Sequence, residues 1–278
     1  MAIAGITNNL SVWENSANTS QQLSNSMTRL SSGTIRPTDN PAGLAISEMM
    51  RAQTSGVNMA QRNMTSQISM HQTAQSFGQS IGSNLTRMRD ITIQAGGITN
   101  ASDRQVLEEE FKMLQDDVAM ITSNDSALGQ FNGTKLFQGD KLSVQSGPDL
   151  GQTTDIEMSD LQITSSTSAG GISFGEVIDS VNGLQMMDST ALESLDAAID
   201  INSGSRVSNA INERTAGLRL EGLRDFENNL QSSESSIRNV DFAKESVNIA
   251  KLLIQNKVNN ALYAQGNDLS SFGILKLL

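Results

Sequence analysis

Apolar residues recur every three or four positions along both ends of the chain, a spacing that predicts long amphipathic helices. The first helix is expected to end at the Ser-Ser-Gly stop that closes with Gly33. A second is expected over about 42–95, and a third behind the cap signal that starts at Asn100. The same spacing returns over about 192–265. The two ends therefore predict a mainly helical protein.

The third helix has the most regular apolar stripe in the chain, with steps of four, three, four and three residues. Its members are Leu107, Phe111, Leu114, Val118 and Ile121. We expect this helix to pack antiparallel against the second. Pro37, Pro41 and Pro148 are the three prolines of the sequence, so no proline interrupts a predicted helix.

The middle of the chain has a different period. Asn132-Gly133 is a turn dipeptide, and apolar residues alternate with polar ones on either side of the Gly147-Pro148-Asp149 turn, over about 131–163. This pattern predicts a β-hairpin. The Ser, Thr, Ala and Gly residues of 164–171 predict a flexible surface loop.

Composition narrows the class of protein. A net charge of −11 and a pI near 4.5 argue against nucleic acid or a membrane as a partner, because both reward clusters of Lys and Arg. The chain has no cysteine, which excludes disulfides and thiolate zinc sites. Aromatic residues make up only 4%. We therefore expect narrow helix–helix interfaces rather than one broad hydrophobic core.

The N-terminal 35 residues carry only two charged side chains, Glu14 and Arg29, and are otherwise rich in Ser, Asn, Gln and Thr. Such a helix is marginal alone and should be ordered only when other helices surround it. The N-terminus has neither the basic nor the apolar region of a Sec-type signal peptide. No apolar run reaches the length of a membrane span.

The sequence gives little support for a catalytic function. The string at 171–175 fits G-x-S-x-G, but that motif needs a histidine downstream, and the single histidine, His71, lies upstream on a helical stripe. One imidazole without thiols cannot build an ordinary zinc site. We therefore expect no enzyme activity, no catalytic residue, no cofactor and no metal, and we expect His71 to lie in a helical seam.

Eight segments at the two ends of the sequence form a recognisable pattern: 30–33, 40–47, 60–63, 72–74, 85–94, 131–136, 235–243 and 261–267. Together they resemble the N-terminal and C-terminal signatures of bacterial flagellin. The resemblance covers about residues 3–139 and 195–278, and it is ordered and bipartite, which makes it more specific than any single motif.

The resemblance implies an antiparallel coiled coil of the two termini in the core of a filament, beside a helical rod with a small outward hairpin region. Because the middle of the chain is short, it resembles a minimal flagellin. The implied divisions are 1–40 and 245–278 for the filament-core helices, 41–131 and 191–244 for the rod, and 132–190 for the hairpin and outward loop. The expected filament-core packing residues are Leu10, Trp13, Leu23, Met27, Ile254, Val258 and Leu262.

The resemblance also implies partners. These are other copies of the chain in a helical homopolymer, an export chaperone, the flagellar type III export apparatus, and the filament cap and hook-associated proteins. The protein would be extracellular, exported without a cleaved signal peptide. Leu85, Arg87 and Glu110 match the surface that the vertebrate flagellin-sensing Toll-like receptor reads in related flagellins. The alternative for this surface is that Arg87 and Arg89 only form salt bridges with acidic neighbours.

Two other functions compete with a filament subunit. The hook-filament junction protein shares flagellin-like termini but would not polymerise indefinitely. A secreted enzyme or adhesin on a coiled-coil stalk would need a larger head than the middle of this chain provides.

Overall fold

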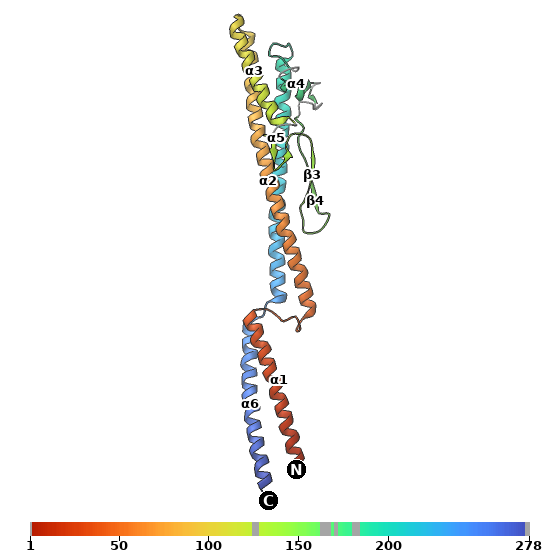
Figure 1. Ribbon diagram of the computed structural model, residues 1–278, viewed down its shortest axis with the longest axis vertical. Helices are drawn as coiled ribbons and strands as arrows, with labels where there is room; N and C mark the ends of the chain where they lie inside the picture. Colours follow the sequence, from red (N-terminus) through yellow and green to blue (C-terminus); the bar gives the residue numbers. More distant parts are fainter. Residues whose placement is uncertain (1, 124–127, 162–167, 170–171, 180–183, 276–278) are drawn as a thin grey trace. The chain divides into compact units, whose positions relative to one another are not determined.

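The computed structural model describes residues 2–123, 128–161, 168–169, 172–179 and 184–275 (Figure 1). The chain forms two compact units. The terminal unit contains residues 1–52 and 229–278, and the middle unit contains residues 53–228. As predicted, the fold is mainly helical, and the helices of the two termini pack together.

The terminal unit is built on α1 (Ala2–Ser32) and α6 (Phe242–Leu275), which lie antiparallel (Figure 1). α1 ends at Gly33, whose φ of 68° is the left-handed conformation that glycine adopts without strain. The Gly33 amide donates to the carbonyl of Arg29 at 2.8 Å, closing the last turn. The predicted stop is therefore confirmed.

The segments that follow α1 and precede α6 are joined to each other. Thr34 and Asn239 form an antiparallel β-bridge. The Ile35 amide donates to the Arg238 carbonyl at 2.8 Å, and the Val240 amide donates to the Gly33 carbonyl at 3.0 Å. The unit also contains the start of α2 (Pro41–Gly96) and the end of α5 (Ala191–Arg238).

The middle unit holds the main hydrophobic core, between α2, α3 (Ala101–Thr122), α5 and the strand region (Figure 1). Along α2 the buried positions follow steps of three and four from Val57 to Met88. In α3 the predicted stripe is buried except for the half-buried Leu114, and Asn100 caps the helix by accepting from the Ser102 amide. α2 and α3 lie side by side, as expected (Figure 1).

The predicted strand region is confirmed. β1 (Gln130–Phe131) and β2 (Thr134–Lys135) pair around Asn132 and Gly133, which both have positive φ, as a tight hairpin turn requires. β3 (Lys141–Gln145) pairs antiparallel with β4 (Thr153–Glu157), and Leu142 lies opposite Ile156.

The structure differs in part from the flexible loop predicted at 164–171. Residues 164–167 and 170–171 lie outside the described residues, but β5 (Ser168–Ala169) pairs with β6 (Ile172–Ser173). The short helix α4 (Phe174–Ile178) follows, and its Phe174 side chain is fully buried. Among the described residues, no helix combines the length and hydropathy needed to cross a membrane.

Candidate assembly surface

Side-chain hydrogen bonds between hydroxyl and amide groups join α1 to α6, some of them exposed and some part-buried. Ser, Thr and Asn side chains meet at successive levels along the two helices, in the register of an antiparallel pair. The bonds are Ser16 Oγ to Asn260 Oδ1 (3.4 Å), Asn259 Nδ2 to Thr19 Oγ1 (3.4 Å), Asn256 Nδ2 to Ser20 Oγ (2.8 Å) and Asn248 Nδ2 to Ser26 Oγ (3.2 Å). We call this set the polar ladder.

An ion-pair network closes the polar ladder near the end of α1. Arg29 Nη2 lies 2.8 Å from Glu245 Oε1, and Arg29 Nη1 lies 2.9 Å from Asp39 Oδ2. Ser26, one turn earlier, is fully buried and accepts from Arg29. The network therefore ties α1, α6 and the segment after α1 together.

The network shifts the ionisation of its members. Burial raises the pKa of Glu245, but hydrogen bonds from Ser26 and Arg29 and the charge of Arg29 outweigh it, and the net pKa is lowered. The hydrogen bond to Glu245 is the largest cause that raises the pKa of Arg29, and the hydrogen bond to Asp39 is the next. The pair is therefore ionised at neutral pH.

Many large apolar side chains of the two helices are exposed. Six of the seven predicted packing residues are about half exposed or more: Leu10 (57%), Trp13 (58%), Met27 (58%), Ile254 (64%), Val258 (50%) and Leu262 (49%). The seventh, Leu23, is half-buried. The pair also buries apolar side chains: Leu252 is 4% exposed, and Val12 and Leu30 are half-buried.

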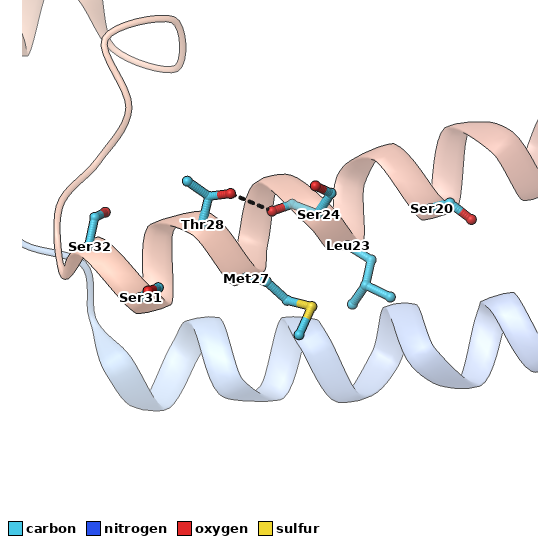
Figure 2. Close-up of a pocket in the computed structure, with 7 residues that line it drawn as sticks. All are labelled: Ser20, Leu23, Ser24, Met27, Thr28, Ser31 and Ser32. Atoms are coloured by element: carbon cyan, nitrogen blue, oxygen red, sulfur yellow. Dashed lines mark hydrogen bonds between the residues drawn. The ribbon is translucent and has the colours of Figure 1, made fainter.

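A groove of about 560 Å³ runs along α1. It is lined by Ser20, Leu23, Ser24, Met27, Thr28, Ser31 and Ser32 (Figure 2). Leu23 and Met27 point toward α6, and the Thr28 hydroxyl donates to the Ser24 carbonyl at 2.8 Å. That internal bond satisfies the hydroxyl, so the groove surface is less polar than its residue names suggest.

The residues expected at a receptor surface divide into two groups. Arg87 and Glu110 are partly exposed, and Arg87 Nη2 lies 2.7 Å from Glu110 Oε1. Leu85 has no exposed surface, because it lies on the buried stripe of α2 in the main core. The expectation that Leu85 offers a contact surface is therefore wrong for the folded chain. Arg89 pairs with Asp196 at 2.6 Å, so both arginines do form salt bridges with acidic neighbours.

His71 lies in the α2 seam, as predicted. It is fully buried, and its Nδ1 lies 3.0 Å from Asn209 Oδ1. Burial lowers its pKa, against the opposing effects of the Asn209 hydrogen bond and the Glu213 charge. Across the described part of the chain, no group of three or more His, Asp or Glu side chains is arranged to hold a metal ion. The first glycine of the G-x-S-x-G string, at 171, lies outside the described residues.

The geometry defines a class of protein: a mainly helical subunit with paired terminal helices that carry exposed apolar side chains. Two family models match this sequence, the bacterial flagellin N-terminal helical region over residues 5–141 and the bacterial flagellin C-terminal helical region over residues 205–278. The chain belongs to the bacterial flagellin family. It is a structural subunit of the flagellar filament and polymerises with copies of itself.

The sequence similarity to known proteins extends over most of this chain and most of theirs. A flagellin of Halalkalibacterium halodurans is 31% identical over 87% of this chain and 86% of its own. The flagellar filament core protein flaB2 of Brachyspira hyodysenteriae is 31% identical over 92% of each chain. A solved structure of a flagellar hook-associated protein from Vibrio parahaemolyticus is 16% identical, with a TM-score of 0.43, and covers 81% of this chain and all of its own. The full-length filament relatives favour the filament subunit over the junction protein.

Proposed function

We propose that the α1–α6 pair drives polymerisation, by burying its outward apolar side chains against neighbouring subunits in the filament core. The observation that carries this proposal is the set of large apolar side chains on α1 and α6 that are about half exposed or more. Burying a large apolar side chain contributes about 1.5–3 kcal/mol, so a few such residues on each subunit suffice to drive association. Leu10, Trp13, Met27, Ile254, Val258 and Leu262 are the contributors, and half-buried Leu23 completes the set.

Polymerisation of this kind couples folding to assembly. The pair alone buries few large apolar side chains, and both helices gain packing only when neighbours arrive. A chain with loosely held termini suits passage in an unfolded form through the type III export apparatus. An export chaperone would cover the apolar side chains beforehand, and the filament cap and hook-associated proteins would receive the subunit outside the cell.

Reassembly tests the proposal. Purified protein is dissociated by heat, returned to neutral conditions with filament seeds, and followed by light scattering and negative-stain electron microscopy. Ile254→Ser should slow elongation at least about tenfold, the equivalent of 1.4 kcal/mol at the contact. The matched control is Val207→Ser, because Val207 is β-branched and 59% exposed but lies in the middle unit. Equal losses in both variants would reject the assignment to α1 and α6.

A second proposal concerns the innate-immune receptor. We propose that Arg87 and Glu110 belong to a receptor contact, because their ion pair is partly exposed and leaves guanidinium surface free. Reporter cells that carry the flagellin-sensing Toll-like receptor test it with monomeric protein. Arg87→Ala should weaken the response more than Arg89→Ala, which breaks a similar ion pair. Equal responses would leave Arg87 with a structural role alone.

A further inference from the structure

A small pocket in the middle unit lies between α2 and the strand region. Its volume is about 150 Å³, which is enough for one six-membered ring. Asn63, Ser66, Gln67 and Met70 line it from α2, and their spacing of three and four positions places them on one face of the helix. Asn63 Nδ2 donates to the Gln145 carbonyl at 3.0 Å, which ties α2 to β3 beside the pocket.

The strands line the rest of the pocket. Phe131 and Thr134 are paired across the tight β1–β2 hairpin, so their side chains lie on the same face of it. Leu142 and Val144 are two positions apart on β3, so they also share a face. Regular elements on both sides therefore hold the shape of the pocket.

Gln67 is buried in this lining with an unused hydrogen-bonding atom. Its side chain is 6% exposed, and its Oε1 has no hydrogen-bond partner among the described residues. Burying a polar group without a partner costs free energy, and most buried polar atoms in folded proteins are therefore paired. The Gln67 amide is thus a place where a bound molecule would gain a hydrogen bond that the chain itself does not make.

The lining combines hydrogen-bonding side chains with an apolar wall. No charged side chain is among the described residues that line the pocket. The polar members carry only amide and hydroxyl groups: Asn63, Ser66, Gln67, Asn132 and Thr134. The apolar members belong to the main hydrophobic core or pack against it: Met70, Phe131, Leu142 and Val144. The pocket therefore suits a neutral molecule that is polar on one part of its surface and apolar on another.

We propose that this pocket binds a neutral pyranose ring of a carbohydrate. A pyranose carries hydroxyl groups around its edge and C–H groups on its faces, and the half-buried Phe131 offers an aromatic ring to one face. A hydroxyl both donates and accepts, so it bonds to the Gln67 amide whichever way that amide is turned. A purely apolar ring would leave Gln67 unpaired, and an anionic sugar would meet no cation in the described lining.

Methyl NMR of the monomer tests the proposal, because Met70 lines the pocket. Protein with isotope-labelled methionine methyl groups is titrated with the methyl glycosides of glucose, galactose and N-acetylglucosamine, and Met70→Leu assigns the signal. At least one glycoside should shift the Met70 signal saturably and leave that of the exposed Met113 on α3 unchanged. No shift with any glycoside, or an equal shift with cyclohexanol, would overturn the proposal.

Substitution of Gln67 gives a second readout. Gln67→Met keeps the length of the side chain and should weaken glycoside binding at least about fivefold, the loss expected for one hydrogen bond. It should not lower the melting temperature, because it removes a buried oxygen without a partner. Gln72→Met, the same change at an exposed position of α2 outside the pocket, should bind like wild type.

Two results with these variants would contradict the proposal. Undiminished binding by Gln67→Met would place the glycoside elsewhere. A lower melting temperature without a change in binding would show that the amide has a structural partner, such as a bound water. If Gln67→Met does not fold, Ser66→Ala repeats the test, because it removes an exposed hydroxyl from the same lining and leaves the core unchanged.

Neutral pyranose rings reach an extracellular protein from two sources, polysaccharide made by the bacterium itself and glycans of an animal surface. Wild-type and Gln67→Met filaments are adsorbed to each source, immobilised separately, with and without the free glycoside. The source whose adsorption falls with both Gln67→Met and the free glycoside is the one that the pocket recognises. Adsorption that neither change reduces on either source would count against the proposal.

Discussion

The two units of this flagellin place their apolar side chains in opposite ways. In the middle unit, Leu85, Met88 and Phe111 are fully buried, and the ion pairs lie on the surface. In the terminal unit, the polar ladder joins α1 to α6 through exposed and part-buried bonds, and Trp13 and Ile254 are more than half exposed.

This difference implies that the two units are stabilised by different interactions. Burial of apolar side chains is the main favourable term in folding, so the middle unit has what it needs within one chain. Hydrogen bonds between partly exposed groups add only about 0.5–1.5 kcal/mol each, and the polar ladder therefore fixes the register of α1 and α6 more than it stabilises them. If the proposed function holds, further stabilisation of the terminal unit comes from contact with neighbouring subunits.

The largest expected effect is in the core of the middle unit. Phe111→Ala should lower the free energy of unfolding by about 3–5 kcal/mol, because it opens a cavity where the side chain is 1% exposed. Urea denaturation followed by circular dichroism measures it. Met113→Ala, on the same helix but 62% exposed, is the control and should change the free energy by less than about 0.5 kcal/mol. Similar losses would contradict the contrast between the units.

The next effect falls on the terminal unit. Arg29→Ala removes the ion pair of Glu245, a carboxylate that is 13% exposed, and should weaken the α1–α6 pair by about 1–3 kcal/mol. Hydrogen exchange of the amides of α1 and α6 should accelerate accordingly, while that of 53–228 should not. Arg51→Ala, whose partner Glu48 is well exposed, should have a much smaller effect.

The lowered pKa of Glu245 also predicts an acid dependence. A carboxyl group with a lowered pKa in the folded state stabilises above its unfolded value, near 4.5, and loses that contribution as pH falls through the folded value. Wild-type α1 and α6 should therefore lose exchange protection below that pH. Glu245→Gln should reduce the exchange protection of α1 and α6 at neutral pH. The variant should then lose less protection than wild type when the pH is lowered.

A smaller effect should come from His71 in the middle unit. Burial holds its folded-state pKa below 6.5, so the unfolded chain binds the proton more readily, and the free energy of unfolding should fall as pH drops below 6.5. Urea unfolding at about pH 7.5 and 5.5 measures this slope. His71 is the single histidine, so His71→Gln should flatten it. An unchanged slope would mean that carboxyl groups cause it.

The smallest effect should come from one bond of the polar ladder. Asn256→Ala removes the 2.8 Å bond to Ser20 and should weaken the α1–α6 pair by only about 0.5 kcal/mol in the monomer. Exchange of the nearby α1 amides should accelerate about twofold. A loss of several kcal/mol would show that the ladder, and not contact with neighbours, holds the terminal unit together.

Much of the fold could be predicted because its signals are local. The stop at Gly33, the cap at Asn100 and the turn at Asn132-Gly133 each depend on the conformational preferences of a few adjacent residues. The burial of His71 followed from its place on a helical stripe. The same period placed Leu85 between Ile81 and Met88, all fully buried, so the stripe was a better guide to Leu85 than the family resemblance.

The polar ladder could not be predicted. Its Ser and Asn residues give no apolar period, and its partners are as far apart in sequence as Ser16 and Asn260. Nothing local indicates which Asn of α6 meets which Ser of α1. Only the register of the folded pair reveals which residues are bonded to each other.

The distance along the chain between α1 and α6 has a consequence for the order of folding. Ser16 and Asn260 are separated by 244 positions, and closing a flexible loop of that length costs about 5 kcal/mol of chain entropy. Exposed and part-buried bonds lie at the low end of the range given above, so the ladder offsets only part of that cost in an unfolded chain, but a folded segment 53–228 shortens the effective loop. The middle therefore folds first, and the two ends come together last. A subunit emerging at the tip of the filament would thus complete its fold at the moment it meets its neighbours.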